Sequence, residues 1–188
     1  MEIKTDVQLR GTAWNEAIEA FGPVLKGTSN RTHYNIFMFA LSIGILYDKR
    51  ISKLEIGENE DSKSVPRNVM QNNDNGKLDM LFQAAILSTT TQDFTEEERL
   101  DLAFGDKTEF NKIGFLTEFA NYGVTKLLEQ KGDTALETME NLKNFVELTI
   151  TGQNLDITEL PDDFYLDEEY SIGTETTMLK VAEIPSYD

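Results

Sequence analysis

Histidine occurs once in this chain, at His33, and cysteine does not occur at all. A hydrolase that pairs a serine nucleophile with a histidine base would depend on this one side chain. Zinc sites built from histidine and cysteine cannot be assembled from this composition. His33 stands beside Tyr34 at the start of an apolar segment. Histidine at such a position is more typical of a structural contact than of catalysis, so we assign no catalytic residue.

Carboxylates are the other groups that could do chemistry. The segment Gln71–Gly76 resembles a calcium-binding loop in its asparagine content. Its first ligand position holds Gln71 and its twelfth holds Phe82, where such loops need carboxylates. We therefore interpret it as a turn. The acidic cluster between Asp162 and Glu169 could hold a cation weakly, although a solvated acidic stretch is the simpler interpretation. We expect no metal site and no cofactor.

The tripeptide Glu129-Gln130-Lys131 matches half of a metal-dependent nuclease motif. It falls at the end of a predicted helix rather than on a strand, and no acidic partner precedes it on a predicted strand. The chain also has no glycine-rich phosphate-binding loop and no nucleophile elbow. We expect the protein not to be an enzyme, and we keep a nuclease as an alternative.

The formal net charge of −17 over 188 residues limits the partners. Phosphate backbones and anionic lipids should repel such a chain, so we expect no direct nucleic-acid contact and no membrane contact. The charge either keeps the protein soluble or directs it to a basic partner. The N-terminus is charged, and the apolar run 36–47 is too short to span a bilayer. A cytoplasmic location is the expectation.

Hydrophobic periodicity predicts a mostly α fold. Apolar residues at helical spacing indicate helices near 12–21, 32–47, 78–90, 95–104, 108–130 and 134–150. The second of these is apolar all round and should lie in the core, where Gly44 would allow another element to approach closely. Thr95 and Glu98 form a capping-box pattern. We expect the last helix to turn these residues inward: Leu136, Met139, Leu142, Phe145, Val146 and Ile150.

Short strands are predicted near 51–56 and in the C-terminal segment, and the polar stretch 48–76 is predicted to be irregular. A loop of that length is either functional or mobile. The predicted organisation is therefore a single compact helical domain over residues 1–152, with minor β structure, followed by an acidic extension over residues 153–188.

The C-terminal extension combines negative charge with apolar residues. Residues 155–188 hold ten Asp and Glu against one Lys, Lys180, with aromatic and aliphatic side chains between them. This composition is typical of docking tails, and a tail that folds back on its own domain is an equal alternative. The candidate partner-binding residues are Asp162, Asp163, Phe164, Tyr165, Asp167, Glu168, Glu169 and Tyr170.

Two segments resemble a known family. Asn35-Ile36-Phe37-Met38-Phe39-Ala40-Leu41-Ser42-Ile43-Gly44-Ile45, followed by Asp48-Lys49-Arg50, is similar to the "FAA-x-x-G" helix of small accessory proteins encoded beside DNA phosphorothioation (Dnd) systems. Phe115-Leu116-Thr117-Glu118-Phe119-Ala120-Asn121-Tyr122-Gly123-Val124-Thr125-Lys126-Leu127-Leu128 resembles the "EEYANGGL"-like second signature of that family. Ser42 and Tyr122 depart from the family pattern, which covers roughly residues 30–150.

Both signatures are helix-packing patterns, so the resemblance implies a fold and a setting but transfers no active-site residue. The setting is prokaryotic anti-phage defence, as a helper to larger ATPase or nuclease components. We expect a non-enzymatic accessory subunit that docks on a larger protein encoded in the same operon. An acidic DNA-mimic inhibitor and a metal-dependent nuclease are the two alternatives. The oligomeric state is left open.

Overall fold

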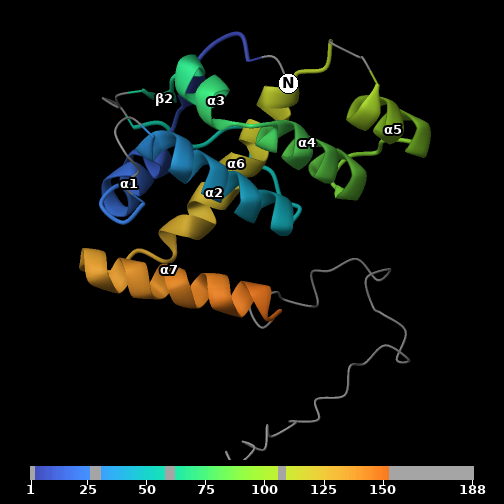
Figure 1. Ribbon diagram of the computed structural model, residues 1–188. Helices are drawn as coiled ribbons and strands as arrows, with labels where there is room; N and C mark the ends of the chain where they lie inside the picture. Colours follow the sequence, from blue (N-terminus) through green and yellow to red (C-terminus); the bar gives the residue numbers. More distant parts are fainter. Residues whose placement is uncertain (1–2, 26–30, 58–61, 106–108, 153–188) are drawn as a thin grey trace, which may run out of the picture. The chain divides into compact units, whose positions relative to one another are not determined.

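The computed structural model describes residues 3–25, 31–57, 62–105 and 109–152, and the descriptions that follow concern these residues (Figure 1). The fold is mostly α, as predicted. The elements in chain order are β1 (Val7–Leu9), α1 (Thr12–Phe21), α2 (Thr32–Leu46), β2 (Lys63–Val65), α3 (Arg67–Asn73), α4 (Lys77–Ser88), α5 (Glu96–Phe104), α6 (Lys112–Leu128) and α7 (Ala135–Ile150).

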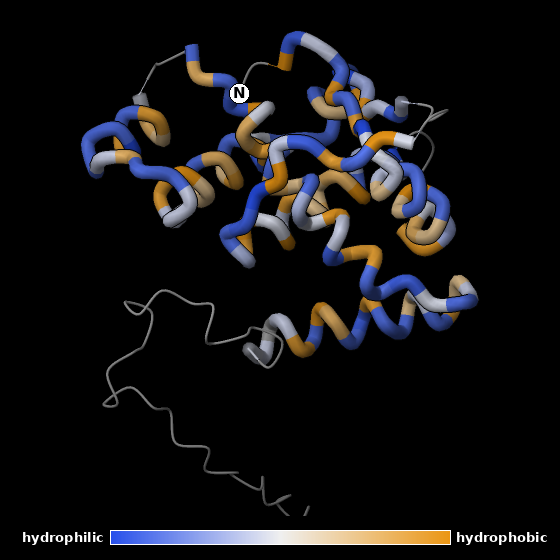
Figure 2. The backbone as a smooth tube through the Cα atoms, turned by 180° about the vertical axis from the view of Figure 1, so that it is seen from behind, coloured by the Kyte–Doolittle hydropathy of each residue, from blue (hydrophilic) through white to orange (hydrophobic). Residues whose placement is uncertain are grey.

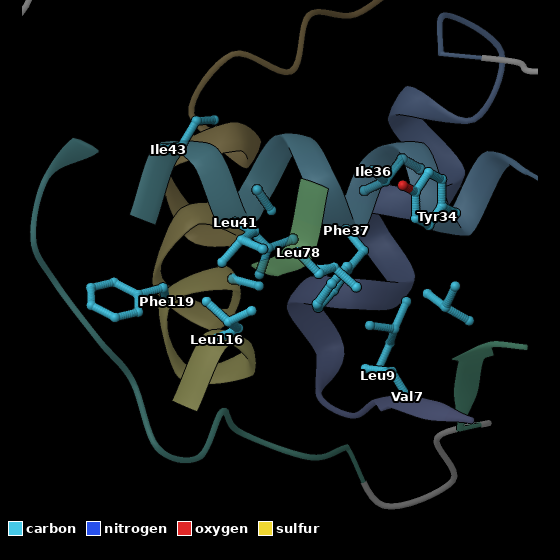
Figure 3. Close-up of a cluster of buried hydrophobic side chains, with 14 of the residues drawn as sticks. Val7, Leu9, Tyr34, Ile36, Phe37, Leu41, Ile43, Leu78, Leu116 and Phe119 are labelled. Atoms are coloured by element: carbon cyan, nitrogen blue, oxygen red, sulfur yellow. The ribbon is translucent and has the colours of Figure 1, made fainter. Parts of the chain in front are cut away.

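The centre of the domain is the crossing of α2 and α6, the most extensive contact between elements of the described chain. The two helices contribute five side chains that are fully shielded from solvent: Ile36, Phe37, Leu41, Leu116 and Phe119 (Figure 3). Helix α2 is apolar on every side, which is why it occupies the middle of the fold. The prediction of a central core helix is therefore confirmed.

Two glycines let α2 and α6 approach so closely. A Cβ atom on Gly44 would collide with the backbone carbonyl of Phe119, and one on Gly123 would collide with the backbone carbonyl of Ala40. Each glycine therefore faces the backbone of the opposite helix. The close approach expected at Gly44 is confirmed, and Gly123 makes it reciprocal.

The remaining helices surround this pair. Helix α5 lies beside α4 at the edge of the domain (Figure 1). The α4–α5 pair is antiparallel, because the Gln83 side chain donates to the Ala103 carbonyl at 3.1 Å and Arg99 donates to the Ile86 carbonyl at 2.7 Å. The predicted capping box of α5 is present, with Thr95 accepting from the Glu98 N–H and the Glu98 carboxylate accepting from the Thr95 N–H.

The β structure differs from the prediction. Residues 51–56 form no strand. The backbone there bonds to other elements instead: the Ile51 N–H donates to the Glu118 carbonyl of α6, and the Thr12 N–H donates to the Glu55 carbonyl. The two strands of the described residues are β1 and β2, which pair antiparallel with Val7 opposite Val65. The strand predicted in the C-terminal segment lies outside the described residues.

The described parts of the stretch 48–76, residues 48–57 and 62–76, contain more regular structure than predicted. They contain β2 and helix α3, and only Asp74-Asn75-Gly76 makes the turn that we assigned to all of Gln71–Gly76. Asn75 and Gly76 have positive φ angles, which suit a tight turn. The sequence prediction missed α3 because this helix is short and has few apolar residues; Met70 is its one fully buried residue.

The predicted inward orientation of α7 is confirmed in part. Leu142 and Phe145 are buried as predicted, together with Thr138, whereas Leu136 is 61% exposed and Met139 is 50% exposed. Helix α7 contacts the domain chiefly through α1, so one narrow face is covered and the flanking apolar positions stay open. Figure 2 shows hydrophobic and hydrophilic positions alternating along this helix. Val146 is partly buried, and the side chain of Ile150 lies outside the described part.

Among the described residues, no helix combines the length and apolar character that crossing a membrane requires.

Candidate functional site

His33 has a structural contact. Its Nδ1 lies 2.9 Å from the Ser64 carbonyl oxygen, and because a carbonyl only accepts, the ring nitrogen donates. This bond fastens the start of α2 to β2. Nearby, Tyr34 donates to the Asn73 carbonyl at 3.3 Å. Burial, with a smaller contribution from the negative charge of Asp74, raises the pKa of the Tyr34 phenol above its usual value near 10.

The asparagine of the second signature connects three segments. Asn121 is 8% exposed; its Oδ1 accepts from Trp14 Nε1 at 2.9 Å and its Nδ2 donates to the Ile51 carbonyl at 2.9 Å. Hydrogen bonds of this one side-chain amide on α6 therefore link helix α1 to the segment after α2. Asn121 ties the backbone at Ile51 to the Trp14 indole.

The Asp48-Lys49-Arg50 run that follows α2 fastens the connection between α4 and α5. The Asp48 carboxylate accepts from Thr90 N at 2.6 Å and from Thr90 Oγ1 at 2.8 Å. Asp48 has φ +46, a left-handed conformation that aspartate adopts more readily than most residues. Asp48 therefore holds the loop between α4 and α5 in place.

Arg50 is held by several partners at once. Its Nη1 donates to Gln92 Oε1 at 2.9 Å and to Glu118 Oε2 at 3.3 Å, and its Nε donates to Thr91 Oγ1 at 3.0 Å. The guanidinium also lies 4.9 Å from the centre of the Phe115 ring. Arg50 thus links the α4–α5 connection to α6.

A broad, polar cleft runs between the N-terminal segment and the start of α6. Residues 3–8 form one wall, and residues 109–118 of the α6 region form another. Several of its polar groups already serve the fold: Arg50 is bonded as described, and the Asp6 carboxylate accepts from the Arg67 N–H at 2.8 Å. Arg50 and Asp6 are therefore polar groups of the cleft that hold the fold together.

The nuclease-like tripeptide lies at the end of α6. Glu129 is paired with Lys126 at 3.1 Å, and this bond is the main reason that the pKa of Lys126 is raised. The Lys131 N–H donates to the Leu128 carbonyl. Across the described segments, no group of three or more His, Cys, Asp or Glu side chains could hold a metal ion. The nuclease alternative stays a prediction.

The predicted partner-binding residues, Asp162 to Tyr170, lie outside the described residues. The sequence interpretation overlooked a different candidate surface on α5. Leu100 is 48% exposed and Phe104 is 65% exposed, one turn apart on the same helix. Glu96, Glu97 and Asp101 stand beside them and line the same shallow depression. The signal was available in the sequence, since Glu97, Leu100, Asp101 and Phe104 recur at helical spacing.

Comparison with protein-family models, with characterised proteins and with solved structures found no match to this chain.

Proposed function

We propose that this protein is a non-enzymatic accessory subunit that docks on a larger protein of a prokaryotic anti-phage defence complex in the cytoplasm. The larger protein would be an ATPase or nuclease component encoded nearby. The defence setting is supported by the resemblance of the α2 and α6 segments to the Dnd-associated accessory proteins.

The observation that carries the docking role is the apolar surface of the peripheral helix α5, where Leu100 is 48% exposed and Phe104 is 65% exposed. Exposing large apolar side chains to water is unfavourable unless another surface covers them, and clusters of such side chains mark interaction sites. The packing of the signature residues into the core is consistent with a scaffold that presents this helix.

Co-expression with the products of the genes that flank its own tests the proposal. The tagged full-length chain should retain a larger protein through purification, and size-exclusion chromatography should show one complex. A truncation that ends at Gly152 reports on the acidic C-terminal segment: loss of the partner would assign docking to residues 153–188, and retention would assign it to the helical domain. Purification of free protein alone would refute the accessory role.

A DNA-mimic inhibitor is the second candidate, and the net charge of −17 favours it. Such a protein would occupy a basic nucleic-acid groove with its carboxylates. DNA added to the purified complex would then displace the chain, whereas an accessory subunit would stay bound while DNA binds elsewhere on the partner.

A further inference from the structure

One side of α5 combines exposed apolar residues with carboxylates. We call it the acidic–apolar face, and it consists of Glu96, Glu97, Leu100, Asp101 and Phe104. Leu100 and Phe104 lie four positions apart on the helix and so form a single apolar ridge. The three carboxyl side chains flank the ridge, and none of the five residues is basic.

The face belongs to a helix that is firmly held. The Thr95–Glu98 capping box fixes its first turn, and Leu102 and Ala103 are buried on the opposite side. The one basic residue of α5, Arg99, donates to the Ile86 carbonyl of α4 at 2.7 Å and lies 5.8 Å from the Phe94 ring centre. Arg99 therefore serves the α4–α5 contact. A preformed helix loses little conformational entropy on binding, which favours recognition.

We propose that the acidic–apolar face of α5 binds a basic amphipathic helix of the protein partner. This inference rests on the proposed accessory role and names the chemistry of the docking site. An apolar stripe on the partner helix packs against Leu100 and Phe104, following the helix-to-surface mode in which residues at i, i+3, i+4 and i+7 are the anchors. Lysine or arginine side chains beside that stripe pair with Glu96, Glu97 and Asp101.

Charge selects this occupant over the others. Nucleic acid is negative, and a second copy of this chain carries the same −17. Residues 155–188 of the chain itself hold ten acidic residues and one basic residue. Each of these would bring like charge to the three carboxylates, which lowers affinity and slows encounter.

The test is photocrosslinking in the co-expressed complex, with the full-length chain and the products of the flanking genes. Leu100→p-benzoylphenylalanine places the reactive group on the ridge, and Met139→p-benzoylphenylalanine on α7 is the matched control because its side chain is exposed to a similar extent. We expect a crosslink from position 100 to a lysine- or arginine-rich amphipathic segment of the partner, and none from position 139. A crosslink to an acidic segment, to residues 153–188, to a second copy or to nucleic acid would overturn the inference.

Two surface variants give a second readout that does not depend on the crosslinker. The double variant Leu100→Ser/Phe104→Ser should reduce the co-purified partner by about tenfold or more, as loss of apolar anchors does at other interfaces. The control Leu136→Ser/Met139→Ser should retain it. If the wild-type chain binds the partner and the α5 variant binds equally well, the inference is wrong and the accessory role stands. If the wild-type chain binds no partner, both fail.

Discussion

The α2–α6 crossing and the acidic–apolar face of α5 use similar residue types in opposite ways. At the crossing, phenylalanine and leucine side chains are buried, the helix backbones touch at Gly44 and Gly123, and the polar side chain of Asn121 has a partner on each side. On α5, leucine and phenylalanine side chains stand in solvent beside carboxylates. The difference separates residues whose substitution should unfold the domain from residues whose substitution should leave it folded.

The buried residues of the two signature segments are ones whose substitution should unfold the domain. Their small residues allow two backbones to meet, and their asparagine links α1 to the segment after α2. A family resemblance built on such residues reports a fold, because packing geometry limits which side chains fit there. We propose that recognition of a partner falls to α5, which lies outside the two signature segments.

The largest expected effect on stability is at the crossing itself. Gly123→Ala places a methyl group against the Ala40 carbonyl, and the neighbour is backbone that cannot rotate away. We expect a loss of about 3 kcal/mol or more in the free energy of unfolding, at the upper end for overpacked cores. Urea denaturation followed by circular dichroism measures it. Ser42→Ala on α2, whose exposed hydroxyl bonds back to Met38, is the control and should change little.

The Asn121 amide should rank next. Asn121→Leu keeps the volume but leaves the Trp14 indole N–H and the Ile51 carbonyl without their partner. Unsatisfied buried groups of this kind cost roughly 1–3 kcal/mol each, so we expect a loss of about 2–3 kcal/mol. A shift of the Trp14 fluorescence spectrum should accompany it. Unchanged stability would mean that the amide is not the link between the three segments.

These core features show what the sequence could and could not predict. The apolar pattern of α2 and the Thr95–Glu98 capping box identified their helices because local chemistry decides both. The prediction of a strand at 51–56 was wrong because the Ile51 N–H donates to the carbonyl of Glu118 on α6, which is 67 positions away in the sequence. Leu136 and Met139 were assigned inward because helical spacing defines a stripe but not how much of it a single neighbouring helix covers.

The N-cap of α5 should affect both the stability of the domain and the binding of the partner. Thr95→Ala removes the side-chain acceptor of the Glu98 N–H and should cost about 1 kcal/mol of stability. Fraying of the first turn should also weaken partner binding, since Glu96 and Glu97 lie in it. Thr134→Ala removes the equivalent cap of α7. It should cost a similar amount of stability without affecting the partner, and equal losses of binding in both variants would argue against the α5 assignment.

Alkaline pH offers a milder test of the core. Burial raises the pKa of Tyr34 above its usual value near 10, so the native state holds this proton more tightly than the unfolded chain does. The resulting stabilisation is complete below about pH 10 and declines as the pH rises from there through the raised pKa. Tyr34→Phe should flatten this decline in the melting temperature. An identical alkaline slope in the variant would show that Tyr34 titrates normally.

The smallest effect on stability is expected on the acidic–apolar face. Glu97→Lys reverses an exposed charge in the first turn of α5, where the helix dipole favours a carboxylate, and should lower the free energy of unfolding by only about 0.5 kcal/mol. It should nevertheless slow association with a basic partner and reduce its salt dependence, because it removes attraction at the docking surface. Stopped-flow or biolayer measurements at two salt concentrations test this, with the exposed Glu140→Lys on α7 as the control. Equal slowing by both variants would indicate a general effect of net charge.

The most direct measurement determines stability and partner retention for one variant, Leu100→Ser/Phe104→Ser, in the full-length chain co-expressed with its flanking-gene products. Our account predicts that the free energy of unfolding falls by no more than about 2 kcal/mol, since both side chains are about half exposed or more, together with loss of the co-purified partner. Retention of the partner at the wild-type level by a folded variant would contradict the account.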